Sequence, residues 1–410
     1  MQETIRQSNI QPIRMKGGKG FRHKILVLTG SLGDGHRQAA RAILETAGAG
    51  GPDVEAVVVD LLEWTHPRLH SVGKFLFEQW VKKLPASYSY LFQKTRGDNT
   101  LSKLAKSMQS YNLNRMLELL HEVKPTVVVS TFPPASAAMS ALKTRGLTDV
   151  PFVTVVTDHT DHSFWIYPLT DKYLVASERV REALVRKGVS VEQIEATGIP
   201  IGLSYGQSVD RDGLRDRHGL HRSLPTVLVM GGGLGMIDEE FTDMLKSPAF
   251  ANDVQFILVC GRNRKLEQEL KDEFRHAGSR VLVTGFVDHV HELMALSDLI
   301  MTKPGGLTTS EALASQLPML LYPSQLGQEK DNAAYLTGIG AALEAGSLSE
   351  LSDLLANLLK DRSLLDAMKR RAAMHQPKTP STRVLQAVVD TRTHRLPYWE
   401  ESVLPMYAEA

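Results

Sequence analysis

The sequence contains little cysteine, no long apolar run and almost no net charge. Its single cysteine, Cys260, excludes an intramolecular disulfide and indicates a reducing compartment. Because Cys260 ends an apolar run, we interpret it as a buried strand residue and not as a catalytic thiol. No stretch approaches the roughly 20 apolar residues of a membrane span, and the first residues carry no apolar block of a secretory signal. A net charge of +1 gives no global field that would attract nucleic acid, so we expect no nucleic-acid partner. The single cysteine leads us to expect a cytoplasmic protein.

The length and the hydrophobic pattern predict two α/β domains. At 410 residues the chain exceeds one ordinary core. Short β-branched runs alternate with helical patterns, as in parallel βαβ architecture. Each run is nearly continuously apolar, which is typical of strands covered by helices on both faces. The predicted strands are 24–29, 54–60, 126–131, 152–157 and 172–176, followed by 226–230, 254–260, 280–284, 298–302 and 318–322.

A polar, charged segment separates the two sets of strands. The fold class that follows is α/β, with two Rossmann-like, doubly wound domains facing across a cleft. The N-terminal arm holds several lysines and arginines against one acidic residue, and we interpret it as a solvated segment. The predicted parts are the basic arm (1–23), an N-terminal domain (24–201), a linker (202–224), a C-terminal domain (225–375) and a C-terminal helix and tail (376–410) that returns to the N-terminal domain.

A glycine-rich loop, GSLGDGH (30–36), follows the first predicted strand and opens a helix. Such a loop lets the backbone approach a ligand and leaves helix N–H groups free for an anion. Its spacing matches neither the dinucleotide fingerprint nor the P-loop. His36 is expected to point into the crevice at the carboxyl edge of the sheet, and we favour a base or phosphate contact over a local helix-start hydrogen bond. Asp34 is interpreted as the cap of the helix, with polarisation of His36 as the alternative.

Three glycine-rich turns follow three strands of the second domain, at 231–235, 261–263 and 303–308. They present bare amides at one edge of the sheet, and the last two add a cation, which suits a diphosphate without a metal. A helix is predicted from Thr308, and Glu311 about one turn into it can accept two hydrogen bonds from a ribose diol. The alternative is a glutamate that merely favours the helix dipole.

The sequence shows no set of residues with the spacing of metal ligands, and we expect no cofactor. The nearest set lies in TDHTDH (157–162) and consists of Asp158, His159, Asp161 and His162. We interpret this segment as a polar loop in the crevice between the domains and not as a metal site.

Four segments carry a resemblance to a known family. GDGHRQAARAI (33–43) and the ordered run from Gly285 to Leu336, with TKPGG, EA, P, GQE and N in sequence, are similar to glycosyltransferase family 28. Within it, TDHTDHSFW (157–165) and DKYLVAS (171–177) resemble the monogalactosyl- and glucosyl-diacylglycerol synthases. The resemblance covers 24–390. It implies the GT-B fold and an inverting, metal-independent transfer of a hexose from a UDP-sugar to 1,2-diacylglycerol, with the nucleotide on the C-terminal domain.

The resemblance also implies roles for single residues. His36 matches the histidine that acts as base or organises the acceptor and phosphate, and Asp158 or Asp161 would be the next choice of base. The implied donor contacts are Gly232, Gly233, Gly305, Gly306 and Thr308 for the diphosphate with Arg262 as cation, the backbone of Phe286 and Val287 for uracil, Glu311 for the ribose, and Gln328, Glu329 and Asn332 for the sugar.

Residues 66–96 combine six lysines or arginines and one acidic residue with interleaved aromatic rings. Leu76, Trp80 and Leu84 recur at i+4 and predict one helix face. This composition favours an anionic membrane surface over a core-facing helix with a basic rim, so we expect a peripheral protein on the inner face of the cell membrane. The expected acceptor or membrane contacts are Phe75, Trp80, Lys82, Lys83, Phe92, Asp158 and Trp165.

Two other functions stay open at this point. One is a UDP-N-acetylglucosamine-dependent transferase that acts on a polyprenyl-linked cell-wall precursor, and the other is a UDP-sugar-binding sensor or epimerase-like protein. An epimerase would act on free UDP-sugar and would not need an amphipathic segment such as 66–96. Glucose is slightly favoured over galactose because GQEKDN (327–332) is similar to the bacterial glucosyl enzymes. The sequence leaves open whether further sugars are added.

Overall fold

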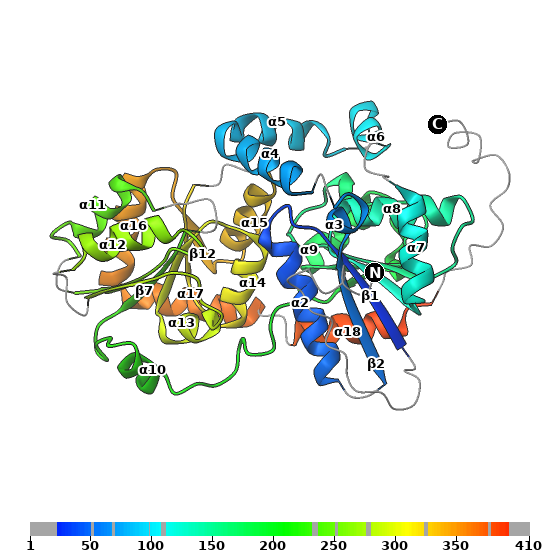
Figure 1. Ribbon diagram of the computed structural model, residues 1–410. Coiled ribbons are helices and arrows are strands. Elements are labelled where there is room, and N and C mark those ends of the chain that lie inside the picture. Colours follow the sequence, from blue (N-terminus) through cyan, green and yellow to red (C-terminus); the bar gives the residue numbers. More distant parts are fainter. Residues whose placement is uncertain are drawn as a thin grey trace.

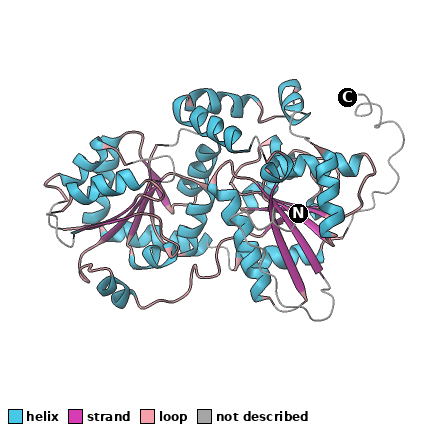
Figure 2. Ribbon diagram, viewed as in Figure 1, coloured by secondary structure: helices cyan, strands magenta, loops and turns pink. Residues whose placement is uncertain are grey.

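Two parallel six-stranded sheets, each with helices on both faces, form the two domains of the protein (Figures 1 and 2). The α/β fold with two doubly wound domains is therefore confirmed. The predicted basic arm lies almost entirely outside the described residues. The computed structural model describes residues 23–50, 53–67, 70–97, 99–107, 112–231, 237–250, 253–275, 280–323, 327–375 and 379–392.

The N-terminal sheet has the strand order β2-β1-β3-β4-β5-β6. The order reverses between β1 and β3, where ligands of doubly wound sheets bind. Leu26 of β1 lies in register with Val57 of β2 and Val128 of β3. The strands are β1 His23–Thr29, β2 Val54–Asp60, β3 Val127–Ser130, β4 Phe152–Val155, β5 Lys172–Val175 and β6 Ile194–Ala196. The helices are α2 Asp34–Ala49, α3 Leu61–Thr65, α4 His70–Lys83, α5 Pro85–Lys94, α6 Thr100–Ser107, α7 Leu113–Val123, α8 Pro133–Thr144 and α9 Glu178–Arg186.

The C-terminal sheet has the order β12-β11-β10-β7-β8-β9, which is the Rossmann order read from the other edge. Its reversal point lies between β7 and β10, and ligands of doubly wound sheets bind at such a point. The strands are β7 Thr226–Met230, β8 Gln255–Val259, β9 Val281–Thr284, β10 Leu299–Thr302, β11 Met319–Leu321 and β12 Ala342–Glu344. The helices are α11 Glu239–Lys246, α12 Arg264–Glu273, α13 Val290–Leu296, α14 Gly306–Ala314, α15 Gly327–Gly338, α16 Leu348–Lys360 and α17 Arg362–His375.

All ten predicted strands are present, each within two residues of its predicted ends. The three-residue edge strands β6 and β12 were not predicted, because so short a run gives no apolar pattern of its own.

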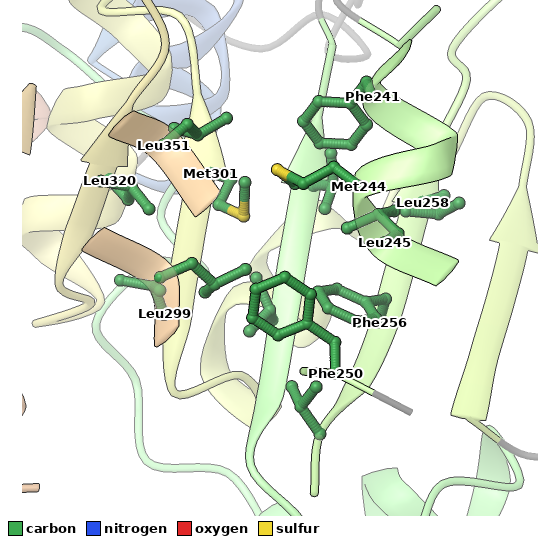
Figure 3. Packing of buried hydrophobic residues seen from close by; sticks show 14 of the residues in the cluster. Phe241, Met244, Leu245, Phe250, Phe256, Leu258, Leu299, Met301, Leu320 and Leu351 are labelled. Carbon is green, nitrogen blue, oxygen red and sulfur yellow. The ribbon is translucent and has the colours of Figure 1, made fainter. Parts of the chain in front are cut away.

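Apolar side chains fill both faces of the C-terminal sheet. Figure 3 shows Phe241 and Met244 of α11 packed against the strands, with Leu299 and Met301 of β10 in the same cluster. Phe241, Leu299 and Met301 are fully buried. Burial of each such side chain contributes about 1.5–3 kcal/mol, and this fixes the sheet that carries the glycine turns.

The polar segment 202–224 is more than a linker. It contains α10 Arg211–Arg217, and Leu214 and Leu220 are buried in the C-terminal core. Arg211 and Arg215 donate to the Asp298 carboxylate, with N–O distances of 2.7 and 2.9 Å. The second half of this segment therefore belongs to the C-terminal domain.

The last described helix, α18 Pro380–Asp390, packs on the N-terminal domain. Val384 and Val388 are fully buried in the same cluster as Ile25 and Val27 of β1. Ser381 Oγ accepts a 2.9 Å hydrogen bond from the backbone N–H of Ile201. The chain thus crosses between the domains twice, and α18 fastens its end to the first sheet (Figure 1).

Candidate active site

The loop after β1 brings an acidic side chain to the boundary between the domains. Helix α2 begins at Asp34, and its N-cap is Gly33, which has φ of 110° and makes no side-chain capping bond. Our interpretation of Asp34 as the cap is therefore wrong. Its carboxylate instead lies 3.6 Å from Nη1 of Arg262, which follows β8 in the other domain. Both side chains are exposed, so this ion pair is weak and able to open for a ligand.

His36 lies in the first turn of α2 with its ring held on several sides. Its Nδ1 is 3.0 Å from Oγ1 of Thr157, the residue two positions after β4. The ring packs against Phe132 and Trp165, with centroid distances of 5.4 and 5.9 Å. Burial lowers the pKa of His36 to about 4, so the imidazole is neutral at pH 7 and has a lone pair for a proton. Thr157 was missed from the sequence, because only the fold brings β4 beside α2.

Trp165, expected at the membrane or acceptor, is buried and lines the His36 pocket. The short 3₁₀ turn Ser163–Trp165 positions it. The side chain therefore faces the reacting region and not the outer surface.

The start of α14 lies at the boundary between the domains. The helix begins at Gly306, two residues earlier than predicted, and its N-cap Gly305 makes no side-chain capping bond. The first N–H groups of a helix have no partner within the helix, and together with the helix dipole they favour an anion. Thr308 lies in the same first turn and is half-buried. A Cβ at Gly306 would lie 2.1 Å from the carbonyl oxygen of Thr157, so only glycine fits where the domains meet.

Glu311 lies in the second turn of α14, within reach of the same region. Burial raises the pKa of its carboxyl group to about 7, and a hydrogen bond from the Tyr205 side chain opposes this rise. Tyr205 belongs to the segment that crosses between the domains, and nothing in the sequence pointed to it. A carboxylate held in this way keeps lone pairs for a ligand with two adjacent hydroxyl groups.

The loops after β8 and β9 contact each other through Arg262 and Phe286. The Arg262 guanidinium lies over the Phe286 ring, 5.2 Å from its centroid, and Phe286 is 52% exposed. Val287 packs against the C-terminal core. Burial raises the pKa of the neighbouring Cys260 thiol to about 11, so this thiol stays protonated at neutral pH. Gly232 and Gly233, expected at the diphosphate, lie outside the described residues.

Asn332 of α15 joins the two domains. Its side chain is fully buried and donates to Asp158 Oδ1 and to the carbonyl oxygen of Pro304, both at 2.9 Å. Its Oδ1 accepts the backbone N–H of His159 at 2.7 Å. Three hydrogen bonds therefore engage the amide that we expected to face the donor sugar.

Asp158, expected on the acceptor side, lies at the same junction. It also accepts a hydrogen bond from the backbone N–H of Gly306, and burial raises its pKa to about 7, with the nearby carboxylates of Glu329 and Asp331 adding to the effect. Asp158, one of the two alternatives to His36 as base, is therefore already engaged in hydrogen bonds at the junction between the domains.

Helix α5 supplies side chains to the same place and packs against α15 (Figure 1). The Tyr88 side chain hydrogen-bonds with Gln328 and lies near the charges of Asp158 and Glu329. Gln328 Oε1 is buried and has no hydrogen-bond partner among the residues that the structure describes. A Cβ at Gly327 would lie 2.1 Å from the Phe92 ring, so Phe92 packs at the junction and not outward. The sequence showed Tyr88 only as one of several aromatic residues.

A network of charged groups closes the junction. Arg96 donates to Asp331 at 2.9 Å and to Asp161 at 2.7 Å, and Lys187 lies 3.3 Å from Asp161. His162 Nε2 is 2.8 Å from the carbonyl oxygen of Phe92. The side chains of the TDHTDH segment thus hold the domains together, which agrees with our interpretation of a polar loop.

Helices α4, α5 and α6 lie together along one edge of the molecule, apart from both sheets (Figure 1). Phe75 and Leu76 are 58% and 61% exposed, and Lys83 is exposed. Trp80 is half-buried, and its Nε1 donates to Ser87 Oγ at 2.9 Å. Phe75 and Leu76 of α4 therefore do not face a core.

The predicted face of Leu76, Trp80 and Leu84 is only partly correct. Helix α4 ends at Lys83, and Leu84 is the N-cap of α5. The Lys82 side chain lies outside the described residues. Among the helices that the structure describes, none combines the length and the apolar character needed to cross a bilayer.

Comparison with known proteins agrees with this arrangement. The family described as monogalactosyldiacylglycerol (MGDG) synthase matches residues 36–201, and the glycosyltransferase family 28 C-terminal domain matches residues 226–384. A processive diacylglycerol beta-glucosyltransferase of Staphylococcus carnosus (strain TM300) is 31% identical over 392 residues, which cover 94% of this chain and 97% of that protein. The chain belongs to the glycosyltransferase family of these enzymes.

Solved structures of other proteins share the fold. Staphylococcus aureus MnaA with UDP has a TM-score of 0.58 and 17% identity over 89% of this chain and 96% of that chain. MurG of Acinetobacter baumannii has a TM-score of 0.54 and 15% identity over 90% of this chain and 99% of that chain. At such low identities these likenesses show the GT-B fold alone, and the resemblance to family 28 found in the sequence is confirmed by the family matches.

Proposed function

We propose that this glycosyltransferase transfers a hexose, preferably glucose, from a UDP-sugar to the hydroxyl group of 1,2-diacylglycerol, with inversion and without a metal. The observation that carries the proposal is the match of the N-terminal domain, 36–201, to the MGDG synthase family. The GT-B fold is shared by proteins with different acceptors, so the fold does not select one. The family match of the N-terminal domain favours diacylglycerol as the acceptor.

The donor-binding half of the proposal rests on α14. The first-turn N–H groups of Leu307 and Thr308, which have no partner within the helix, supply amide donors for a diphosphate, and Arg262 supplies a cation at the same edge. Glu311, one turn further, supplies the acceptors for a ribose diol. These groups stabilise the charge of the departing UDP, which is the task that a metal performs in other transferases. The same contacts fit the UDP-sugar of a sensor or epimerase, so they support the donor and not the acceptor.

The acceptor half rests on His36. A neutral imidazole can take the proton of the attacking hydroxyl group, and such general-base catalysis is typically worth 10²–10⁴-fold. Thr157 and Trp165 fix the orientation of the ring. Asp161 is paired with Arg96 and Lys187, and Asp158 is hydrogen-bonded to Asn332, so both alternative bases are engaged elsewhere.

The lipid reaches the site at the surface of α4. Phe75 and Leu76 expose apolar area beside Lys83, a combination that suits an anionic headgroup layer. Helix α5 continues from this surface to the junction, where Tyr88 meets Gln328. We propose that the protein acts peripherally on the inner face of the cell membrane, with UDP-hexose and diacylglycerol as its substrates.

The deciding experiment is incubation with UDP-glucose or UDP-galactose and diacylglycerol vesicles, with and without EDTA, followed by mass analysis of the lipids. We expect a hexosyl-diacylglycerol product, faster from UDP-glucose, and little effect of the chelator. Product only from a polyprenyl-linked acceptor would favour the cell-wall alternative. UDP-sugar binding without UDP release, or epimerised free UDP-sugar, would favour the sensor or epimerase.

A vesicle experiment tests the membrane surface separately. Replacing both Phe75 and Leu76 with serine should reduce sedimentation with anionic vesicles while UDP binding is kept. The matched control is Met374→Ser, since Met374 of α17 is 72% exposed on the other domain. Equal sedimentation of the α4 variant and wild type would remove this surface from the proposal.

A further inference from the structure

Two histidines and a glutamate converge beside the loop of Phe286 and Val287. His218 is the C-cap of α10, His289 is the N-cap of α13, and Glu292 lies in the first turn of α13. One ligand atom from each lies within 4.8 Å of the other two. Among the residues that the structure describes, this is the one group of three possible metal ligands that meets this condition.

The hydrogen bonding of these three side chains leaves a ring nitrogen of His218 available to a ligand. His218 Nε2 is buried and has no hydrogen-bond partner among the described residues. Buried ring nitrogens in folded proteins are normally bonded, so this nitrogen has an unused coordinating lone pair or N–H. The two imidazole rings face each other at an angle of 22°, with centroids 6.2 Å apart. The carboxylate of Glu292 lies 3.5 Å from Nη1 of the largely exposed Arg217.

The donor set selects the kind of metal. Imidazole nitrogen with one carboxylate oxygen suits Zn²⁺, whereas Ca²⁺ and Mg²⁺ prefer oxygen ligands. Zn–N and Zn–O bonds of about 2.0–2.2 Å in a tetrahedral site place the ligand atoms about 3.3 Å apart. The ligand atoms lie within 4.8 Å of one another, so they must move closer together to reach this spacing. Side-chain rotation can bring them closer, because all three residues lie at or beside helix termini.

We propose that His218, His289 and Glu292 bind one Zn²⁺ ion, with water as the fourth ligand. The ion would join α10, in the segment that crosses between the domains, to the loop of Phe286 and Val287 that precedes α13. It takes no part in sugar transfer, and the proposal does not rest on the proposed function.

The test uses full-length protein without an affinity tag, stripped of metal with EDTA. Zn²⁺ is titrated in competition with a chromophoric chelator, and we expect one equivalent per chain. His218→Ala and Glu292→Gln should each weaken binding at least tenfold. The matched control is His221→Ala, which removes an exposed histidine of the same segment whose ring hydrogen-bonds with Ser223, and this variant should bind as wild type does. Arg217→Ala should tighten binding, because it frees Glu292.

Two further measurements separate a built site from surface binding. Co²⁺ should give the intense visible absorption of a four-coordinate site in wild type and lose it in His218→Ala. Zn²⁺ should raise the Tm of wild type and of His221→Ala but not of His218→Ala. UDP binding by metal-free His218→Ala shows that the variant is folded. No bound Zn²⁺ in wild type, or equal affinity in His218→Ala, would overturn the proposal.

Discussion

Replacing Asn332 with alanine tests whether this residue joins the domains or contacts the donor sugar. The substitution removes three hydrogen bonds, to the backbone N–H of His159, the carbonyl oxygen of Pro304 and the Asp158 carboxyl group, which keeps its bond from Gly306 N–H. Each buried group left unpaired costs about 1–3 kcal/mol. The junction should therefore open more readily by about 2–5 kcal/mol, which corresponds to roughly 30-fold to several thousand-fold faster local exchange.

Hydrogen exchange followed by mass spectrometry measures this opening directly. Peptides covering 157–162 and α15 should exchange faster in Asn332→Ala, while those of the C-terminal core keep their wild-type rates. UDP affinity should stay within about threefold, because the nucleotide contacts lie on α14 and the neighbouring loops. Turnover should fall, since the acceptor domain is no longer aligned with the donor.

The control is Asn357→Ala on α16, where the asparagine is exposed, and it should change neither exchange nor turnover. Unchanged exchange at 157–162 together with a large rise in KM for the UDP-sugar would refute the reasoning. It would place the Asn332 amide on the sugar, as the resemblance to family 28 implies.

Three further outcomes are expected. Glu311→Ala should weaken UDP binding by about 2–4 kcal/mol in calorimetry, since two hydrogen bonds to a carboxylate are lost. Because the pKa of Glu311 is raised to about 7, wild-type UDP affinity should increase as pH rises through 7, and Glu311→Gln should abolish that increase. His36→Ala should abolish transfer but keep UDP binding; near-normal turnover would show a structural histidine. The raised pKa of Asp158 favours the fold at low pH, so its contribution to stability falls as pH rises from about 4 to 7. Denaturation of Asp158→Asn should lack that part of the pH dependence, and an identical profile would contradict the assignment.

The sequence predicted the fold well where the signal is local. Ten apolar runs became ten strands, because a parallel strand covered on both faces must be apolar along its whole length. The helix at 306–314 and the glycine turn before it were also foreseen, since glycines and helix-start signals act within a few residues. A prediction failed where a contact with the other domain decides the outcome. Asp34 follows Gly33 in a pattern typical of a cap, yet its carboxylate turns toward Arg262 of the other domain.

The family, the α/β class and the positions of most candidate site residues were thus determined by the sequence itself. Only the tertiary structure decided which of those residues meet. Asn332 and Asp158 are 174 positions apart, and their hydrogen bond depends on how two separately folded domains dock. The same holds for Thr157 beside His36, for Tyr205 beside Glu311, and for His218 beside His289. Contacts of this kind arise when whole helices, strands and domains pack together, so the spacing of residues along the chain does not predict them.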